Sequence, residues 1–247
     1  MSTKAELKRV RSLHQKKFRD QEGVFLVQGR KMLAELKRSG LYIEAIYVSD
    51  RVEERALTDE ALALPQHELD RIGTLEAGNE VVAVVRKPAS APLGALRAGE
   101  LVLAMDGVAD PGNLGTVLRI ADWFGSRRVV CQAGSVDVFN PKCVQSSMGA
   151  VLRVEVAYTD LGTYLAERRA EGSAIYCATM EGSSVFEVQL RRPAVLVLGN
   201  ESHGLSEAVL ATGTPISVPR SGGAESLNVA MAAAALCMEF ERQFRAG

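Results

Sequence analysis

Six short apolar runs in the second half of the chain constrain its fold more than any other feature. Each run has the length of a β-strand, and several are separated by segments whose apolar residues recur with helical spacing. Such alternation predicts a mostly parallel sheet with helices on both faces, and hence an α/β fold class. The expected strands are 101–105, 128–131, 154–157, 174–178, 194–198 and 215–218, and the expected helices are 114–124, 161–169 and 227–244.

A linker interrupts the chain near residue 90. The stretch 87–94 contains two prolines and several small residues, and it ends a strand-like run. The part before the linker has the pattern of a small α/β domain, with a basic helix first and then further elements. These elements are a strand at 24–27, a helix at about 30–38, and strands at 43–48 and 81–85. We predict an N-terminal domain over residues 1–90, a linker over 91–98 and a second domain over 99–247.

The formal net charge of −1 hides an uneven distribution of charge. Residues 1–19 carry seven cationic side chains and one carboxylate, a net of +6, which leaves −7 for the rest of the chain. A basic arm on an acidic body can bind phosphates, which indicates a nucleic-acid partner. The alternative is a solvated helix that contributes only to solubility.

The sequence favours neither a membrane nor a metal partner. No apolar run reaches the roughly 18 residues that a membrane helix requires, and the polar, basic N-terminal segment is unlike a signal peptide. The four cysteines form no C-x-x-C pair and only three histidines are present, so no zinc site of ordinary spacing is expected. We expect a cytoplasmic protein with reduced cysteines.

Polar side chains occupy three loops that follow expected strands. Asn113 suits the N-cap of the helix after the first loop, and Arg119 falls opposite that helix's apolar face. Either Ser226 or Asn228 could cap the last helix. Taken one at a time, each of these residues can be explained without a functional site, either as a helix cap or as a solvent-exposed side chain. Ligands of such sheets bind beyond the carboxyl ends of strands, so the three loops together predict a site.

The loop 199–204 comes close to two catalytic motifs and matches neither. Its glycines have the G-x-x-x-x-G spacing of a phosphate loop, but Leu205 stands where such a loop requires lysine. The segment 200–204 resembles a G-x-S-x-G elbow that lacks its first glycine. Nucleotide-dependent phosphotransfer is therefore disfavoured, as is serine hydrolysis.

Three segments resemble, in order and spacing, the motifs of the SpoU–TrmH RNA 2′-O-ribose methyltransferases of the SPOUT superfamily. The segments are 113–119 (NLGTVLR), 198–204 (LGNESHG) and 226–230 (SLNVA). The resemblance covers about residues 101–245. The segment 22–29 (EGVFLVQG) resembles the small RNA-binding domain of many members, although the family more often has Glu where this chain has Gln28.

This resemblance implies a deep trefoil knot near the C-terminus, which composition and periodicity do not indicate. It also implies a homodimer whose interface includes the first and last helices of the second domain. The implied cofactor is S-adenosylmethionine. The residues expected to hold it are Thr179, Leu198, Gly199, Gly204, Ile216, Val218 and Leu227.

Arg119 is the catalytic residue that the resemblance implies. A guanidinium hardly deprotonates in proteins, so we expect Arg119 to bind a phosphate and stabilise the forming 2′-oxyanion instead of acting as a base. Asn113 is expected to orient the ribose or the arginine, and Glu201 to pair with Arg119. Ser226 and Asn228 complete the expected pocket.

The expected activity is therefore methylation of a ribose 2′-hydroxyl, in 23S ribosomal RNA by analogy with members that carry such an N-terminal domain. The alternatives are a transfer RNA 2′-O-methyltransferase and a catalytically silent RNA-binding paralogue. The residues expected to bind RNA are Lys8, Arg9, Arg11, Lys16, Lys17, Arg19 and Arg30.

Overall fold

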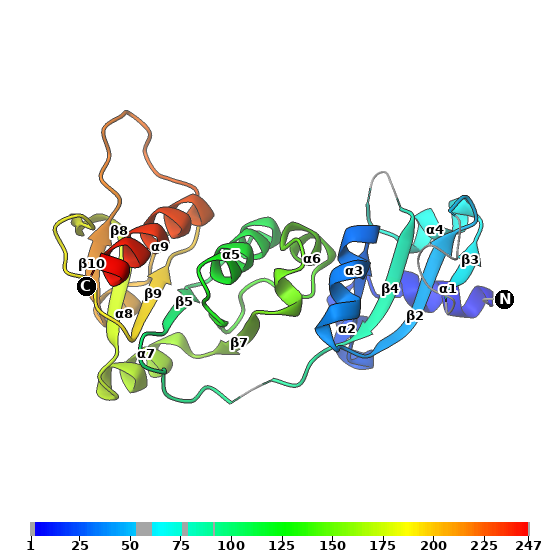
Figure 1. Ribbon diagram of the computed structural model, residues 1–247, viewed down its shortest axis with the longest axis horizontal. Coiled ribbons are helices and arrows are strands. Elements are labelled where there is room, and N and C mark those ends of the chain that lie inside the picture. Colours follow the sequence, from blue (N-terminus) through cyan, green and yellow to red (C-terminus); the bar gives the residue numbers. More distant parts are fainter. Residues whose placement is uncertain (1–2, 53–60, 76–78, 91, 247) are drawn as a thin grey trace. The chain divides into compact units, whose positions relative to one another are not determined.

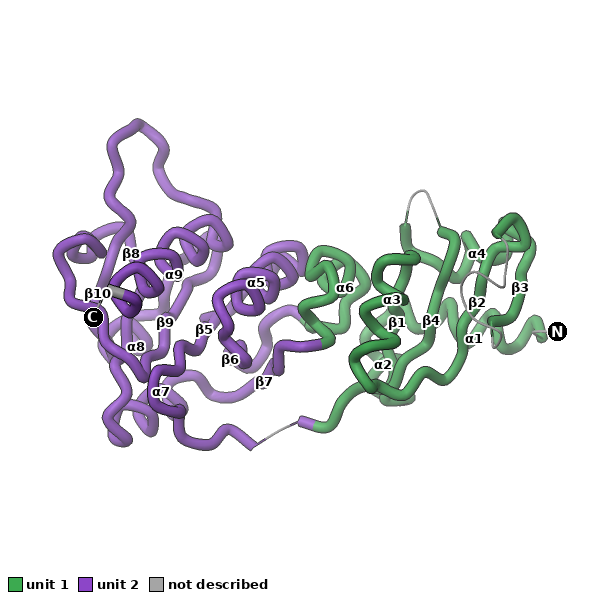
Figure 2. The backbone as a smooth tube through the Cα atoms, viewed as in Figure 1, with its two compact units in different colours: residues 1–89, 137–152 green, residues 90–136, 153–247 purple. Residues whose placement is uncertain are grey.

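The computed structural model describes residues 3–52, 61–75, 79–90 and 92–246, and Figure 1 shows its helices and strands. The chain forms two compact units, which are coloured separately in Figure 2. Unit 1 contains residues 1–89 and 137–152, and unit 2 contains residues 90–136 and 153–247. The chain therefore passes between the units three times.

Unit 2 is built on a six-stranded sheet with the strand order β10-β8-β9-β5-β6-β7. Each of its neighbouring strand pairs is parallel, which confirms the predicted sheet. The central strands β5 and β9 are buried along their whole length because helices cover both faces. The strands are β5 (Leu101–Met105), β6 (Arg128–Gln132), β7 (Glu155–Thr159), β8 (Ala174–Ser184), β9 (Ala194–Leu198) and β10 (Thr214–Ser217).

Two pairs of helices cover the sheet of unit 2. On one face, Val102 and Ala104 of β5 share a core with Leu165 of α7 and Val209 of α8. Helices α5 and α9 pack against each other on the opposite face (Figure 1). The helices are α5 (Pro111–Trp123), α7 (Leu161–Ala170), α8 (Glu207–Leu210) and α9 (Val229–Ala246).

Unit 1 contains a four-stranded sheet in the order β1-β4-β2-β3. Strand β4 is antiparallel to both β1 and β2, whereas β2 and β3 are parallel. The strands are β1 (Val24–Gln28), β2 (Ile43–Ser49), β3 (Leu62–Leu64) and β4 (Val81–Arg86), and the helices beside them are α1 (Lys4–Ser12), α2 (Lys16–Glu22), α3 (Arg30–Ser39) and α4 (Gln66–Ile72).

The basic N-terminal segment is part of the core of unit 1, so the prediction of a basic arm is wrong. It forms two helices, α1 and α2, in place of the single helix expected. Val10 and Leu13 are fully buried in a cluster with Tyr47 of β2. Burial of these apolar side chains holds the segment against the sheet. Its charge count did not reveal this because the apolar residues lie between the cations.

Residues 137–152 belong to unit 1 although they lie between β6 and β7 in the chain. They include α6 (Pro141–Ser146) and the short 3₁₀ helix η2 (Ala150–Leu152). The ring centroids of Phe139 and Phe25 are 4.6 Å apart. Asp137 accepts a hydrogen bond from Arg19, with Nη2 and Oδ2 2.6 Å apart. The compact units are thus not continuous in sequence, and the division at residues 90 and 98 stays a prediction about domains.

Candidate active site

The connections that follow β5 and β9 diverge. These strands are neighbours in the sheet, yet the chain continues from β5 to β6 on one side and from β9 to β10 on the other. Such a reversal opens a crevice at the carboxyl ends of the two strands, where ligands of open α/β sheets bind. The loops 106–110 and 199–206 line this position in the fold.

Helix α5 is capped by Asp110 and not by Asn113 as predicted. The Oδ1 atom of Asp110 accepts a hydrogen bond from the backbone N of Asn113 at 3.0 Å. Pro111 occupies the first turn, which it suits because its missing N–H would have no partner there. The helix therefore begins three residues earlier than expected, and the amide side chain of Asn113 is available for other contacts.

A chain of hydrogen bonds joins Asn113, in the first turn of α5, to one side chain from each of the loops after β9 and β10. Asn113 Nδ2 donates to Glu201 Oε1 at 2.8 Å, and Asn228 Nδ2 donates to Asn113 Oδ1 at 3.0 Å. Asn228 also caps α9, since its Oδ1 atom accepts from the backbone N of Ala230 at 2.9 Å. Residues separated by 88 and 115 positions in the chain thus meet at the end of the sheet.

Glu201 is held as an anion. Its partial burial opposes ionisation, but hydrogen bonds from Asn113 and from backbone N–H groups outweigh burial and hold its pKa below the ordinary value. One of these donors is the backbone N of Ala109, 3.4 Å from Glu201 Oε2. This end of the sheet therefore carries the negative charge of Glu201 at neutral pH.

Arg119 lies on the exposed side of α5, as its helical phase predicts. Within the described ranges its guanidinium has no hydrogen-bond or ion-pair partner. The expected pair between Glu201 and Arg119 is absent, because Asn113 and Ala109 face the two carboxylate oxygens. The guanidinium of Arg119 is free to meet an anionic ligand.

The loop after β9 depends on a close approach of two backbone segments. Asn200 and Gly204 exchange two backbone hydrogen bonds, with N–O distances of 2.9 and 3.0 Å. A Cβ atom on Gly199 would lie 2.4 Å from the carbonyl carbon of Gly204, so only glycine fits. The turn is also tied to the neighbouring loop, since Asn200 Nδ2 donates to the carbonyl O of Gly107 at 2.7 Å.

Sequence reasoning missed Asp106, Asn200 and Ser206. The buried Asp106 follows β5 directly, and its Oδ2 atom accepts from both the backbone N and the Oγ of Ser206 at 2.8 Å. Asn200 supports the turn described above. Their positions in the sequence could have indicated these residues, because Asp106 and Asn200 stand within two residues of the ends of adjacent apolar strands.

The residues expected to hold the cofactor lie in or after β8, β9 and β10, which are adjacent in the sheet. Leu198 and Ile216 are buried, and Thr179, Gly199 and Val218 are half-buried. The other two, Gly204 and Leu227, are exposed.

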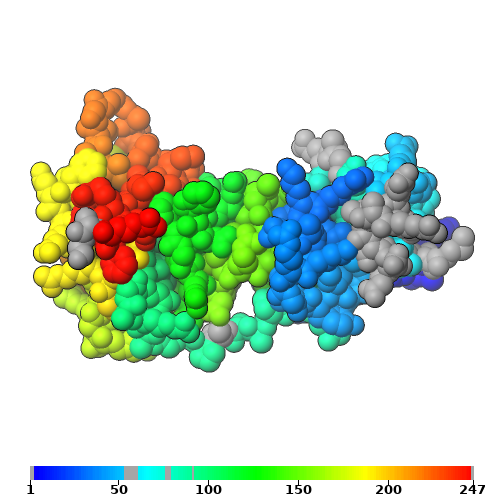
Figure 3. All heavy atoms as spheres, viewed as in Figure 1, coloured from blue at the N-terminus to red at the C-terminus, as the bar shows by residue number. Residues whose placement is uncertain are grey.

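The segment between β10 and α9 stands out from unit 2. Residues 219–228 are all exposed, and the segment forms the orange projection in Figures 1 and 3. Ser226 lies in it and makes no hydrogen bond within the part of the chain that the structure describes. Of the two predicted caps of α9, only Asn228 fills that role.

The structure divides the cations that were expected to bind RNA into two groups. One group has carboxylate partners, so most of its charge is neutralised within unit 1. Arg19 is 1% exposed and pairs with Asp137, which contradicts its assignment to RNA. The further pairs are Arg9 with Glu22 and Glu44, Lys16 with Asp20, and Arg30 with Glu80.

The second group comprises Lys8, Arg11 and Lys17. All three are exposed, and none has an ion-pair partner among the described residues. These cations remain available to phosphates.

The described ranges contain neither a membrane-spanning helix nor a cluster of side chains suited to a metal ion. No described helix has both the length and the apolar composition needed to cross a membrane. No cluster of three or more histidine, cysteine, aspartate or glutamate side chains suited to a metal ion was found in those ranges.

Family models match both parts of the chain. The SpoU rRNA Methylase family model matches residues 100–238, and the MRM3-like substrate binding domain model matches residues 4–87. The 23S rRNA (guanosine(2553)-2′-O)-methyltransferase RlmP of Bacillus subtilis is 34% identical over 92% of both chains. The chain belongs to the SpoU rRNA methylase family.

Solved structures agree with this assignment. The SpoU methyltransferase AviRb from Streptomyces viridochromogenes, in complex with AdoMet, has a TM-score of 0.87 at 28% identity, covering 99% of this chain and 100% of that one. A TrmH-family protein from Porphyromonas gingivalis has a TM-score of 0.86 at 38% identity, covering 98% and 99% of the respective chains.

Proposed function

We propose that this protein transfers a methyl group from S-adenosylmethionine to a ribose 2′-hydroxyl of 23S ribosomal RNA. The observation that carries the proposal is the hydrogen-bonded chain Glu201–Asn113–Asn228, which brings the three family motifs together, and Arg119 of the same helix as Asn113 has no side-chain partner among the described residues. Two relatives named as 23S rRNA 2′-O-methyltransferases, at 34% and 31% identity, support the choice of RNA.

The cofactor fits the ends of β8, β9 and β10. Buried Leu198 and Ile216 anchor the ends of β9 and β10 beneath the proposed cofactor, and the exposed Leu227 side chain can cover it. The anionic Glu201 suits a site for a sulfonium cation. Thr179, Gly199, Gly204 and Val218 complete the proposed set of cofactor residues. The bound cofactor supplies an electrophilic methyl group that needs alignment more than activation.

Arg119 acts on the substrate in this proposal. Because the guanidinium stays protonated, it binds an RNA phosphate and stabilises negative charge as the 2′-oxygen loses its proton to solvent. Asn113 is fixed by hydrogen bonds at both ends of its amide, so it can orient the ribose without reorganising. Ser226 and Asn228 complete the proposed pocket for the ribose.

Substitutions of Arg119 test this role. Arg119→Ala is expected to abolish methyl transfer to 23S rRNA while calorimetry still detects binding of S-adenosylmethionine. Near-normal turnover of this variant would remove Arg119 from the mechanism. Arg119→Lys separates the two chemistries, since a lysine with a pKa near 10.4 is the better proton acceptor. Substantial rescue by lysine would favour base catalysis over bidentate positioning.

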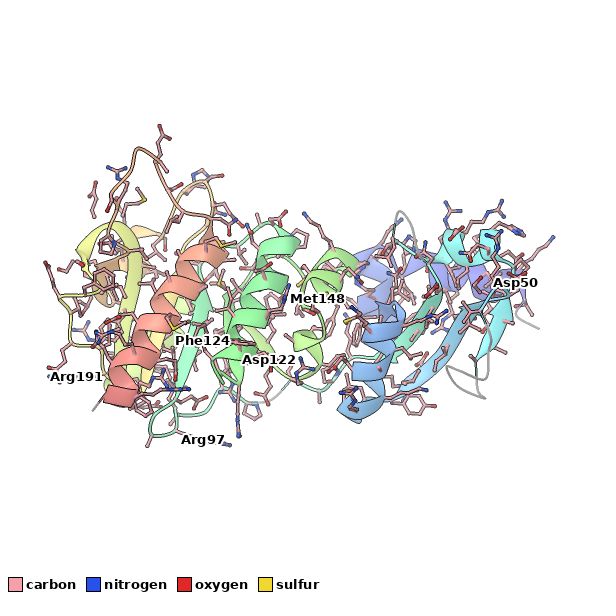
Figure 4. All side chains as sticks on the ribbon, turned by 45° about the horizontal axis from the view of Figure 1, so that its top comes forward. Asp50, Arg97, Asp122, Phe124, Met148 and Arg191 are labelled. Atoms are coloured by element: carbon pink, nitrogen blue, oxygen red, sulfur yellow. The ribbon has the colours of Figure 1, made fainter. Side chains whose placement is uncertain are left out.

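The exposed apolar residues of α5 and α9 support a homodimer. Trp123 is 83% exposed, and Met231, Met238 and Phe244 of α9 are also exposed. Trp123 and Met238 line one cavity together with Phe124, which Figure 4 labels at the end of α5. Apolar side chains gathered on two packed helices are typical of an interface. We expect Met238→Glu to shift the mass measured by light scattering from dimer to monomer.

Unit 1 serves RNA binding in this proposal, and the protein acts in the cytoplasm. The trefoil knot stays a prediction from the resemblance. A transfer RNA substrate is the alternative that mapping of methylated riboses would reveal. A catalytically silent paralogue would show neither methyl transfer nor calorimetric binding of the cofactor.

A further inference from the structure

Helix α1 presents a row of cations without partners. Lys4, Lys8 and Arg11 follow the spacing i, i+4, i+7 and therefore share one face of the helix. All three are exposed, and no ion pair or hydrogen bond of their side chains occurs in the described ranges. The row extends about 10 Å along the helix axis. It differs in this from Arg9 and Lys16, whose charges are paired within the unit.

An exposed aromatic ring lies at the edge of the same unit. Tyr42 is 62% exposed and stands just before β2. The guanidinium carbon of Arg86 lies 4.8 Å from its ring centroid, and the backbone N of Arg86 donates to the carbonyl O of Tyr42. Arg86 covers one face of the ring, and the large exposure of Tyr42 leaves room on the other.

A carboxylate connects this ring to α1. Glu44 Oε1 accepts from Arg86 Nε at 3.2 Å, and Glu44 Oε2 accepts from Arg9 Nη2 at 3.1 Å. Arg9 belongs to α1, so Glu44 fixes the Arg86 guanidinium beside the helix that carries the cations. Holding a flexible arginine in place lowers the entropic cost of stacking upon it.

We propose that unit 1 binds a single-stranded segment of RNA, with an unpaired base stacked on the free face of Tyr42, which Arg86 backs, and phosphates of the same strand on Lys4, Lys8 and Arg11. The proposal rests on RNA being the substrate. An aromatic ring backed by a guanidinium stacks on any base, and the unpaired cations of α1 attract the phosphate backbone. A base within a duplex is already stacked, which is why the surface favours single strands over duplexes.

Binding of the full-length protein to a 12-nucleotide single-stranded RNA, measured by fluorescence anisotropy, tests the stacking site. Tyr42→Ala is expected to weaken binding about tenfold, and Tyr42→Phe to bind within twofold of wild type. Phe186→Ala removes an aromatic ring of similar exposure from unit 2 and serves as the matched control. Tyr42→Ala binding within twofold of wild type would overturn the proposal, as would an equal loss for a duplex of the same sequence.

Salt dependence tests the cations. Replacing Lys4, Lys8 and Arg11 together by glutamine is expected to reduce the slope of log K against log salt by about 2, at roughly 0.7 for each single-strand phosphate contact. The matched control replaces Lys31, Arg51 and Arg71, three exposed cations elsewhere in unit 1. An equal reduction in both triple variants would overturn the assignment to α1.

Methyl transfer separates this inference from the proposed function. In Tyr42→Ala, the KM for ribosomal RNA should rise while kcat and cofactor affinity stay near wild type, because Tyr42 belongs to unit 1 and the three motifs to unit 2. Absence of methyl transfer by the wild-type protein would reject the proposed function and leave the binding result interpretable. An unchanged KM in an active Tyr42→Ala variant would reject the stacking site alone.

Discussion

Replacing Gly199 by alanine tests whether the turn after β9 must stay closed to hold the cofactor. The added Cβ atom would lie 2.4 Å from the carbonyl carbon of Gly204, where ordinary contact begins at 3.4 Å. The two strands of the turn must therefore separate by about 1 Å. That displacement breaks the two backbone hydrogen bonds between Asn200 and Gly204.

The expected loss follows from those two bonds. Each contributes about 1 kcal/mol net, so opening the turn costs about 2 kcal/mol and weakens cofactor binding about thirtyfold. Titration calorimetry with S-adenosylmethionine measures the change. Gly94→Ala is the matched control, because nothing lies within 4 Å of the added Cβ atom at that position. Binding by Gly199→Ala within twofold of wild type would refute the argument.

Three further substitutions test other parts of the structure. Asn113→Asp places a second carboxylate against Glu201, and the two negative charges repel each other. We expect steady-state assays to show kcat reduced at least tenfold, and an unchanged kcat would contradict this expectation. Arg19→Met leaves the buried Asp137 carboxylate without its ion-pair partner. Urea denaturation should show that the free energy of unfolding falls by about 3–5 kcal/mol, and a decrease below about 1 kcal/mol would contradict this expectation. Hydrogen bonds from Arg242 and Gln243 lower the pKa of Glu239 to about 2. The stability that these bonds add is present above about pH 4.5 and is lost as the pH falls toward 2. Glu239→Gln should therefore flatten the plot of unfolding free energy against pH between these values, and an unchanged plot would contradict this expectation.

The sequence predicted the sheet of unit 2 well because its central strands are buried on both faces. The expected strands 101–105 and 194–198 coincide with β5 and β9. The predicted and observed bounds agree less well at the ends of helices and strands, where neighbouring residues compete for the same capping position. Asp110 and Asn113 are both good capping residues, and Pro111 decides between them by fitting the first turn.

Contacts between residues far apart in the sequence could not be predicted from local sequence patterns. The bond between Asn113 and Asn228 joins positions 115 apart, and the pair of Arg19 with Asp137 joins positions 118 apart. Counting charges along residues 1–19 identified cations correctly but could not show that Arg19 has a buried partner. For the same reason, the expected partner of Glu201 was an arginine, whereas the structure supplies an amide.

Mapping of 2′-O-methylated riboses in total RNA tests the central claim most directly. RNA is compared from cells that lack the gene and from the same cells complemented with wild-type protein or with Arg119→Ala. We predict that one ribose of 23S ribosomal RNA loses its methyl group without the gene and regains it only with the wild-type protein. Loss of a site in transfer RNA instead, or restoration of the 23S site by Arg119→Ala, would contradict the proposed activity and its mechanism.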